Sequence, residues 1–189
     1  YQNTQRHSQA EKAYGEALSI YRRLAQKNPD SFERNVAATL NNLAYLHGNA
    51  RCHSQAEGEY EEALAIYRRL ARKNPDVFEA DMAMTLVNRA YLHGITQCYA
   101  QAQEEYAEAL AIYRRLTQKD PNAFEPVVAT NLNNIALLHS NARCYSQAEA
   151  EYEEALAIYR RLKQQRPDAF EAATARILNN LANLHHATR

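Results

Sequence analysis

The sequence predicts an all-α fold, a solenoid of stacked antiparallel helix pairs with eight helices. The first observation is a period of about 46 residues, shown by tyrosines, prolines and histidines that recur in phase: Tyr21, Tyr67, Tyr113, Tyr159; Pro29, Pro75, Pro121, Pro167; His47, His93, His139, His185. A fixed period of this length is typical of stacked repeat architectures. The second is that each repeat contains two stretches with apolar residues at helical spacings. The third is the small number of glycines and prolines, 4 and 5, which leaves no room for a flexible linker. We therefore expect a single solenoid domain over residues 1–189.

Composition narrows the function classes. Lys+Arg and Asp+Glu are both 22, so the formal net charge is zero, and no basic face for nucleic acid is indicated. No apolar run approaches the roughly 18 residues of a membrane span, and the polar opening YQNTQRHSQ is not a signal peptide. The 3 cysteines have no close pairs, which fits a reducing compartment. We therefore expect a cytoplasmic protein without nucleic-acid or membrane partners.

The clearer helix of each pair has small and aromatic residues at spacings of three and four. In the second copy these are Ala56, Tyr60, Ala63, Leu64, Tyr67 and Leu70. The ring of Pro75 disfavours helical geometry at the residue before it, so this helix should end near Lys73. The predicted helices of this kind cover about 8–27, 54–73, 100–119 and 146–165.

The other helix of each pair follows the proline. Asp76 lies three residues before Glu79, as in a capping box, so we expect that helix to begin near Glu79. Pro126 suggests a start near that residue in the third copy, because proline suits a first turn. These helices are predicted at about 33–48, 79–94, 125–140 and 171–186, and the short joints between helices make neighbours antiparallel.

The spacing of large and small residues resembles the tetratricopeptide repeat over nearly the whole chain. The pattern consists of Leu40, Leu43, Ala44 and His47 in one helix, then Ala56, Tyr60 and Ala63 in the next, with matches every 46 residues. The period resembles the longer subclass seen in kinesin light chains and bacterial sensor proteins. The resemblance implies a right-handed superhelix that serves as a protein-interaction scaffold. Departures are Arg89 in place of a leucine, and Arg51, Gln97 and Arg143 where the family's turn often has glycine.

In this family the first helix of each repeat lines a concave groove that holds an extended peptide or a partner helix. Carried over, the groove positions are Ala38, Asn41, Asn42, Tyr45, Asn49, Met84, Val87, Asn88, Tyr91, Ile95, Thr130, Asn133, Asn134, Leu137, Asn141, Arg176, Asn179, Asn180 and Asn183. Asparagine amides can pair with a peptide backbone of any sequence, and Tyr45 and Tyr91 would add aromatic area. The alternative is that the asparagines bond a neighbouring helix. The groove lacks the cations of a carboxylate clamp, since it offers only Arg176 and Arg89.

The histidine and cysteine ladders do not predict a metal site. Structural zinc needs four ligands at about 2.0–2.3 Å, and equivalent residues of stacked repeats lie much farther apart. We therefore expect core histidines, no metal, no cofactor, and no disulfide between Cys52, Cys98 and Cys144. No catalytic arrangement and no glycine-rich phosphate loop is present, so no enzymatic activity is expected.

The two ends of the array are expected to be adhesive, as in a fragment of a longer or an engineered array. We predict head-to-tail stacking, with residues 171–186 of one chain packed on residues 8–27 of the next, through Leu18, Tyr21, Ile177, Leu181 and Leu184. Two functions follow. One is a scaffold that binds a protein or peptide in the groove, and the other is a self-associating or consensus-like solenoid with no dedicated ligand.

Overall fold

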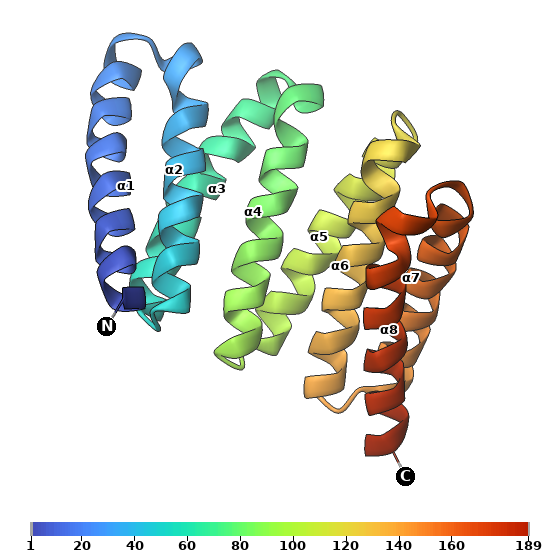
Figure 1. Cartoon of the computed structure of the whole chain (residues 1–189). Coiled ribbons are helices and arrows are strands. Elements are labelled where there is room, and N and C mark those ends of the chain that lie inside the picture. Colours follow the sequence, from blue (N-terminus) through green and yellow to red (C-terminus); the bar gives the residue numbers. More distant parts are fainter. Residues whose placement is uncertain (1, 189) are drawn as a thin grey trace. The chain divides into compact units, whose positions relative to one another are not determined.

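The computed structural model describes the backbone of residues 2–188 and the side chains of residues 6–188. Over that range every regular element is an α-helix, and there are eight, as predicted. Their bounds are α1 Gln2–Lys27, α2 Pro29–Asn49, α3 His53–Lys73, α4 Pro75–Ile95, α5 Tyr99–Thr117, α6 Pro121–Asn141, α7 Tyr145–Gln165 and α8 Pro167–Ala187 (Figure 1). We call the even-numbered helices A helices and the odd-numbered ones B helices. None of the helices in the described range is long and apolar enough to cross a bilayer.

The chain divides into two compact units, Tyr1–Leu92 and His93–Arg189. In unit 1, α2 packs against α1 and α3. In unit 2, α6 packs against α5 and α7, and α7 also packs against α8. The helix pairs are antiparallel and joined by tight turns, so α2 packs between α1 and α3, and α6 packs between α5 and α7 (Figure 1). That position requires an apolar stripe on each of two faces.

The A helices begin at their prolines, four residues before the sequence-based starts. Pro29, Pro121 and Pro167 occupy the first turn, where a missing N–H costs nothing and the fixed φ suits a helix. A single extended residue separates α1 from α2, namely Asn28 with φ −143° and ψ 82°. Asp76 therefore lies inside the first turn of α4 and is not its cap. A side-chain capping contact is present on α6, where the Asp120 carboxylate accepts from the Ala123 N–H at 3.1 Å.

The start expected near Pro126 is wrong, because α6 begins at Pro121 and continues through Pro126. Proline removes the one N–H that would bond the carbonyl four residues earlier. The carbonyl oxygen of Pro126 accepts two hydrogen bonds, from the hydroxyls of Thr130 at 2.9 Å and Tyr159 at 3.2 Å.

The turns from A to B helices use a left-handed residue. Arg51, Gln97 and Arg143 have φ of 63°, 64° and 61°, at the positions where the family often has glycine. In the first of these turns the Arg51 N–H donates to the Gly48 carbonyl at 3.1 Å and the Cys52 N–H donates to the His47 carbonyl at 2.9 Å. This is the Schellman pattern, and it ends the A helix within two residues. The same bonds recur in the other two turns, so the three joints are equivalent.

The core alternates alanine with tyrosine. Ala56 and Ala63 of α3 are fully buried beside Tyr60 and Tyr67, and the small side chains allow close approach of the helix axes. Burial raises the pKa of the Tyr152 phenol in α7 to about 12, so the core phenols stay neutral. Arg89, which replaces a core leucine in α4, is largely buried along its stem and has its guanidinium 3.9 Å from the Glu57 carboxylate.

Candidate functional site

The A helices of unit 1 expose several large apolar side chains. Tyr45 of α2 and Tyr91 of α4 are 54% and 53% exposed, and Met84 of α4 is 46% exposed. Tyr45 and Tyr91 are 46 residues apart, so they hold the same position in successive repeats. We call the predicted groove positions of the A helices the groove face. In unit 1 this face presents two aromatic rings and a flexible thioether to solvent.

A pocket of about 460 Å³ opens between the groove-face helices of unit 1. It is lined by Arg34, Asn35 and Ala38 of α2, Tyr67 of α3, and Asp81 and Met84 of α4, among others. Arg34 donates to the Asp81 carboxylate at 2.8 Å, which joins the two A helices across the pocket. The pocket therefore combines an apolar wall with a fixed ion pair.

The asparagines of the groove face divide into two sets. Asn41 and Asn133 are buried, and each accepts a hydrogen bond from the asparagine 47 residues further on, Asn88 at 3.1 Å and Asn180 at 2.9 Å. These four amides link successive A helices within each unit, which is the alternative that the sequence left open. Asn42 is exposed, so its amide lies at the surface where a ligand could reach it.

The groove face of unit 2 is more polar. Thr130 is exposed and its hydroxyl lies 2.7 Å from the Tyr159 hydroxyl, while Leu137 is 40% exposed. Arg176 and Asn183 on α8 are also exposed. The remaining groove positions are exposed at Asn49, Ile95, Asn141 and Asn179 and half-buried at Ala38, Val87 and Asn134.

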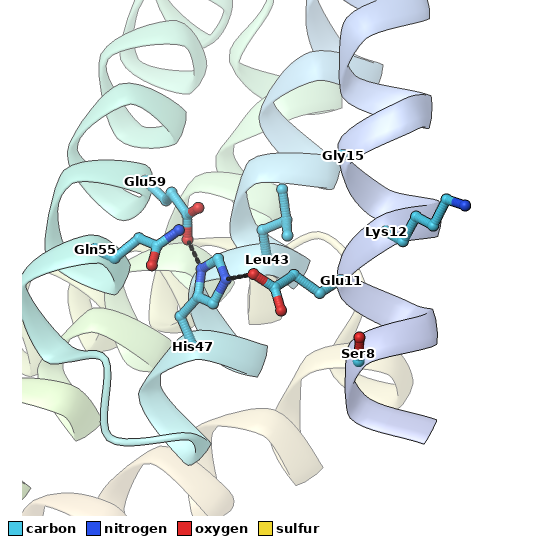
Figure 2. Close-up of a pocket in the computed structure, with 8 residues that line it drawn as sticks. All are labelled: Ser8, Glu11, Lys12, Gly15, Leu43, His47, Gln55 and Glu59. Carbon is cyan, nitrogen blue, oxygen red and sulfur yellow. Dashed lines mark hydrogen bonds and ion pairs between the residues drawn. The ribbon is translucent and has the colours of Figure 1, made fainter. Parts of the chain in front are cut away.

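A second pocket, of about 490 Å³, lies beside His47 in unit 1. Figure 2 shows the imidazole between two carboxylates, with Nδ1 2.7 Å from Glu59 and Nε2 3.4 Å from Glu11. His47 is buried at the end of α2, Glu59 belongs to α3 and Glu11 to α1. The histidine therefore connects all three helices, and both ring nitrogens are engaged.

The pKa values of His47 and Glu59 depend on burial and on the contacts between the imidazole and the carboxylates. Burial lowers the pKa of His47, but the hydrogen bonds and charges of Glu59 and Glu11 outweigh it, so the net pKa is raised. Burial also raises the pKa of Glu59, which the contact with His47 only partly offsets. The pKa of His47 rises because two carboxylates face the imidazole, whereas the pKa of Glu59 rises chiefly because that side chain is partly buried.

Unit 2 repeats the His–Glu link. Nδ1 of His93 lies 2.9 Å from Glu105, and Nδ1 of His139 lies 2.8 Å from Glu151. The buried Nε2 of His139 has no hydrogen-bond partner. Gln103 holds the position equivalent to Glu11, 36 residues before the histidine. Sequence reasoning expected core histidines but missed their carboxylate partners, which the constant separation of 12 residues could have revealed.

The cysteines and histidines do not assemble a metal site in the described part of the chain. Cys52, Cys98 and Cys144 are free thiols, each at the residue before a B helix. No group of three or more His, Cys, Asp or Glu side chains among the described residues could hold a metal ion.

The residues predicted for end-to-end stacking lie mostly in the interior. Ile177, Leu181 and Leu184 are buried on α8, the helix that packs against α7, and so cannot form an exposed docking surface. Leu18 of α1 is also buried, and Tyr21 is half-buried. The exposed large apolar residue of α8 is Leu178, at 44%.

These features define a helical repeat solenoid of the protein-interaction scaffold class. Three family models, each described as tetratricopeptide repeat, match residues 9–87, 91–123 and 128–162. These matches support an array of tetratricopeptide repeats, a repeat type that serves as a protein-interaction scaffold.

Among solved structures, the chain is similar to BtubC (BKLC) from P. vanneervenii, with 26% identity and a TM-score of 0.72. The match covers 96% of this chain and 66% of that chain. The shared solenoid type agrees with the fold predicted from the sequence. No curated protein matches the chain.

Proposed function

We propose that the chain binds an extended peptide or a partner helix on its groove face, with unit 1 as the main contact. The observation that carries this proposal is the joint exposure of Tyr45, Met84 and Tyr91 on the A helices of unit 1, where Met84 also lines the Arg34–Asp81 pocket. Tyrosine supplies large, rigid contact area with a polar tip, and aromatic residues dominate the energetics of many interfaces. A binding role gives a reason for keeping three such side chains in water.

The polar groups of the same face suit a peptide backbone. Asn42 is exposed and carries both a donor and an acceptor, and the Arg34–Asp81 pair offers one of each charge. Asn41 and Asn88 are already bonded to each other and would serve to fix the spacing of α2 and α4. We therefore assign ligand contacts to Asn42, Tyr45 and Tyr91, and a supporting role to the buried amides.

We also place the chain in the long-period subclass that resembles kinesin light chains, on the strength of its 46-residue period, and treat it as one solenoid domain. Three free thiols support a reducing compartment such as the cytoplasm. The rival function, a self-associating solenoid without a dedicated ligand, is favoured by a different observation, the exposed apolar side chain of Leu178 on α8.

The test is a selection from a displayed library of random peptides, followed by affinity measurements with synthetic peptides. Tyr91→Ala should weaken the selected peptides about tenfold or more, because interface tyrosines are common hot spots. Ile20→Ala is the matched control, since Ile20 is 49% exposed on α1, away from the groove positions. Failure to enrich any peptide, or equal effects of the two substitutions, would refute groove binding.

A further inference from the structure

The last A helix exposes a stripe that the other A helices bury. In α2, Ala37, Leu40 and Ala44 are 0 to 1% exposed, and the equivalents in α6, at residues 129, 132 and 136, are 0 to 2% exposed. In α8 the same positions are Ala175, Leu178 and Ala182, and all three are exposed. We call these three residues the α8 stripe. No helix within residues 2–188 covers it.

The covered copies show what kind of surface fits this stripe. In unit 1, Ala44 forms a buried cluster with Ala56 and Tyr60 of α3, the B helix that follows. The alanines admit the facing helix closely, and the tyrosine fills the remaining space. The α8 stripe is therefore complementary in shape to a B helix that carries alanine and tyrosine at this spacing.

The chain itself carries such a helix with the matching residues uncovered. Ala10, Tyr14 and Ala17 of α1 are equivalent to Ala56, Tyr60 and Ala63 of α3, which are 0 to 2% exposed. In α1 the three side chains are only half-buried. The surface that α3 uses to cover α2 thus remains partly open on α1.

We propose that the α8 stripe binds α1 of a second copy of this chain, in the register in which α3 packs on α2. The contact is heterologous, because each chain offers α8 at one end and α1 at the other. A dimer formed by one such contact still has one α8 stripe and one α1 surface with which to bind further chains.

Charges in the same register are complementary. Within the units, B helices of successive repeats are joined by Arg22–Glu62 at 2.5 Å and Arg114–Glu154 at 2.6 Å, each pair 40 residues apart. The next arginine of this series is the exposed Arg160, and the register places it opposite the exposed Glu16 of the second copy.

Two further ion pairs of unit 1 have counterparts of opposite charge across the proposed contact. Arg69–Glu33 at 2.7 Å and Lys73–Asp30 at 2.9 Å join an A helix to the following B helix. Their counterparts across the proposed contact are Glu171 with Arg23 of the second copy, and Asp168 with Lys27 of the second copy. All four side chains are exposed and each pairing is of opposite sign, and Glu171 would add Arg23 to the ion pair that it already forms with Lys163 at 3.0 Å.

The asparagine link also extends across the contact. Asn88 donates to Asn41, and Asn180 donates to Asn133. Asn179 holds the acceptor position on α8 and is exposed, and Asn42 of the second copy holds the donor position and is exposed as well. One link is missing, because Ala13 stands where Glu59 would meet the histidine of the preceding repeat.

Sedimentation velocity across the micromolar range tests the proposal. The unaltered chain should gain mass with concentration. Leu178→Glu should weaken association about tenfold or more, since a carboxylate would be buried against an apolar surface. The control is Leu137→Glu, which places the same charge at a residue 40% exposed on the groove face and should leave association unchanged. A chain that stays monomeric throughout, or equal effects of the two substitutions, overturns the proposal.

A mixing experiment tests the head-to-tail geometry without relying on one variant. Leu178→Glu chains keep an intact α1, and Ala10→Glu chains keep an intact α8 stripe. Each variant alone should be monomeric, and an equimolar mixture should stop at a dimer. Circular dichroism verifies that each variant remains helical. A mixture that stays monomeric, or one that grows beyond a dimer, contradicts the assigned faces.

Two further substitutions probe the register. Arg160→Glu should weaken association, and combining it with Glu16→Arg in the same chain should restore it. Ala13→Glu should strengthen association by supplying a second carboxylate for His185 of the neighbouring chain, whose Nε2 already lies 2.8 Å from Glu149 of its own chain. Asn42 takes part in both proposed contacts, so peptide binding is measured at concentrations where the chain is monomeric. Under those conditions it should be unaffected by all of these changes, and the two proposals can fail independently.

Discussion

The two units hold equivalent histidines in different surroundings. In unit 1, His47 faces the carboxylates of Glu59 and Glu11. In unit 2, His139 faces Glu151 alone, and its buried Nε2 has no hydrogen-bond partner. The difference traces to one residue, since Gln103 stands in unit 2 where unit 1 has Glu11. The same repeat thus carries a three-helix connection in one unit and a two-helix connection in the other.

The comparison shows that the side-chain contacts between helices can differ from one repeat to another while the fold stays the same. The turn after each histidine is the same, with a left-handed residue and the same two backbone bonds. The backbone therefore does not require the second carboxylate. The effect of Glu11 should appear in stability and pH response and leave the helix positions unchanged.

Replacing each histidine by alanine should produce the largest difference in stability between the two units. His47→Ala should destabilise the chain by about 2–3 kcal/mol, because it creates a cavity and leaves Glu59 near Glu11 without the group that joins them. His139→Ala should cost less, since a single carboxylate loses its partner. Urea unfolding gives the totals, and hydrogen exchange of α2–α3 and α6–α7 amides assigns each loss to its unit. Equal losses would show that Glu11 contributes nothing.

Changing Gln103 to glutamate, or Glu11 to glutamine, should reduce the difference in stability between the two histidine sites. Gln103→Glu supplies a carboxylate for Nε2 of His139 and should stabilise the chain by about 0.5 kcal/mol, the range of a partly exposed ion pair. Glu11→Gln should remove a similar amount. Unfolding midpoints in urea at low salt measure both. A destabilising Gln103→Glu would mean that the position lies out of reach of the imidazole.

A change of pH should have the smallest effect on the free energy of unfolding, and the two raised pKa values determine the sign of that effect. The folded state raises the pKa of His47 and of Glu59, so it binds more protons than the unfolded chain. The His47 contribution is complete below about pH 6.5, the ordinary histidine pKa, and is lost as the pH rises through the raised value. The Glu59 contribution has the same sign and begins to fall above its ordinary pKa of 4.5. Unfolding free energies at pH 6 and pH 8 should therefore decrease with pH, and less so in Glu11→Gln.

Much of the fold could be predicted from the sequence. The recurring tyrosines, prolines and histidines fix the repeat period, and the alanine and tyrosine spacing fixes the helices and their pairing. These features are local, so a linear pattern reveals them. The A-helix starts were placed four residues late, because the acid–glutamate spacing of Asp76 and Glu79 imitates a cap.

The candidate sites could be predicted only in part. Exposed Tyr45, Met84 and Tyr91 lie on the groove face that the resemblance assigned to them. The same resemblance also named Asn41 and Asn133, whose amides are buried and bonded within the stack. Neighbouring letters in the sequence cannot distinguish an amide that faces a ligand from one that faces the next helix.

The sequence by itself determined that this chain is a helical array with a 46-residue period and apolar A helices. Only the tertiary structure decided which apolar side chains face which neighbour. An A helix carries two stripes, one for the B helix before it and one for the B helix after it, and both repeat with helical spacing. On α8 the first stripe, with Ile177, Leu181 and Leu184, is buried, and the second, with Leu178, is open. A periodic pattern specifies that a face is apolar, whereas its coverage depends on which helices pack there.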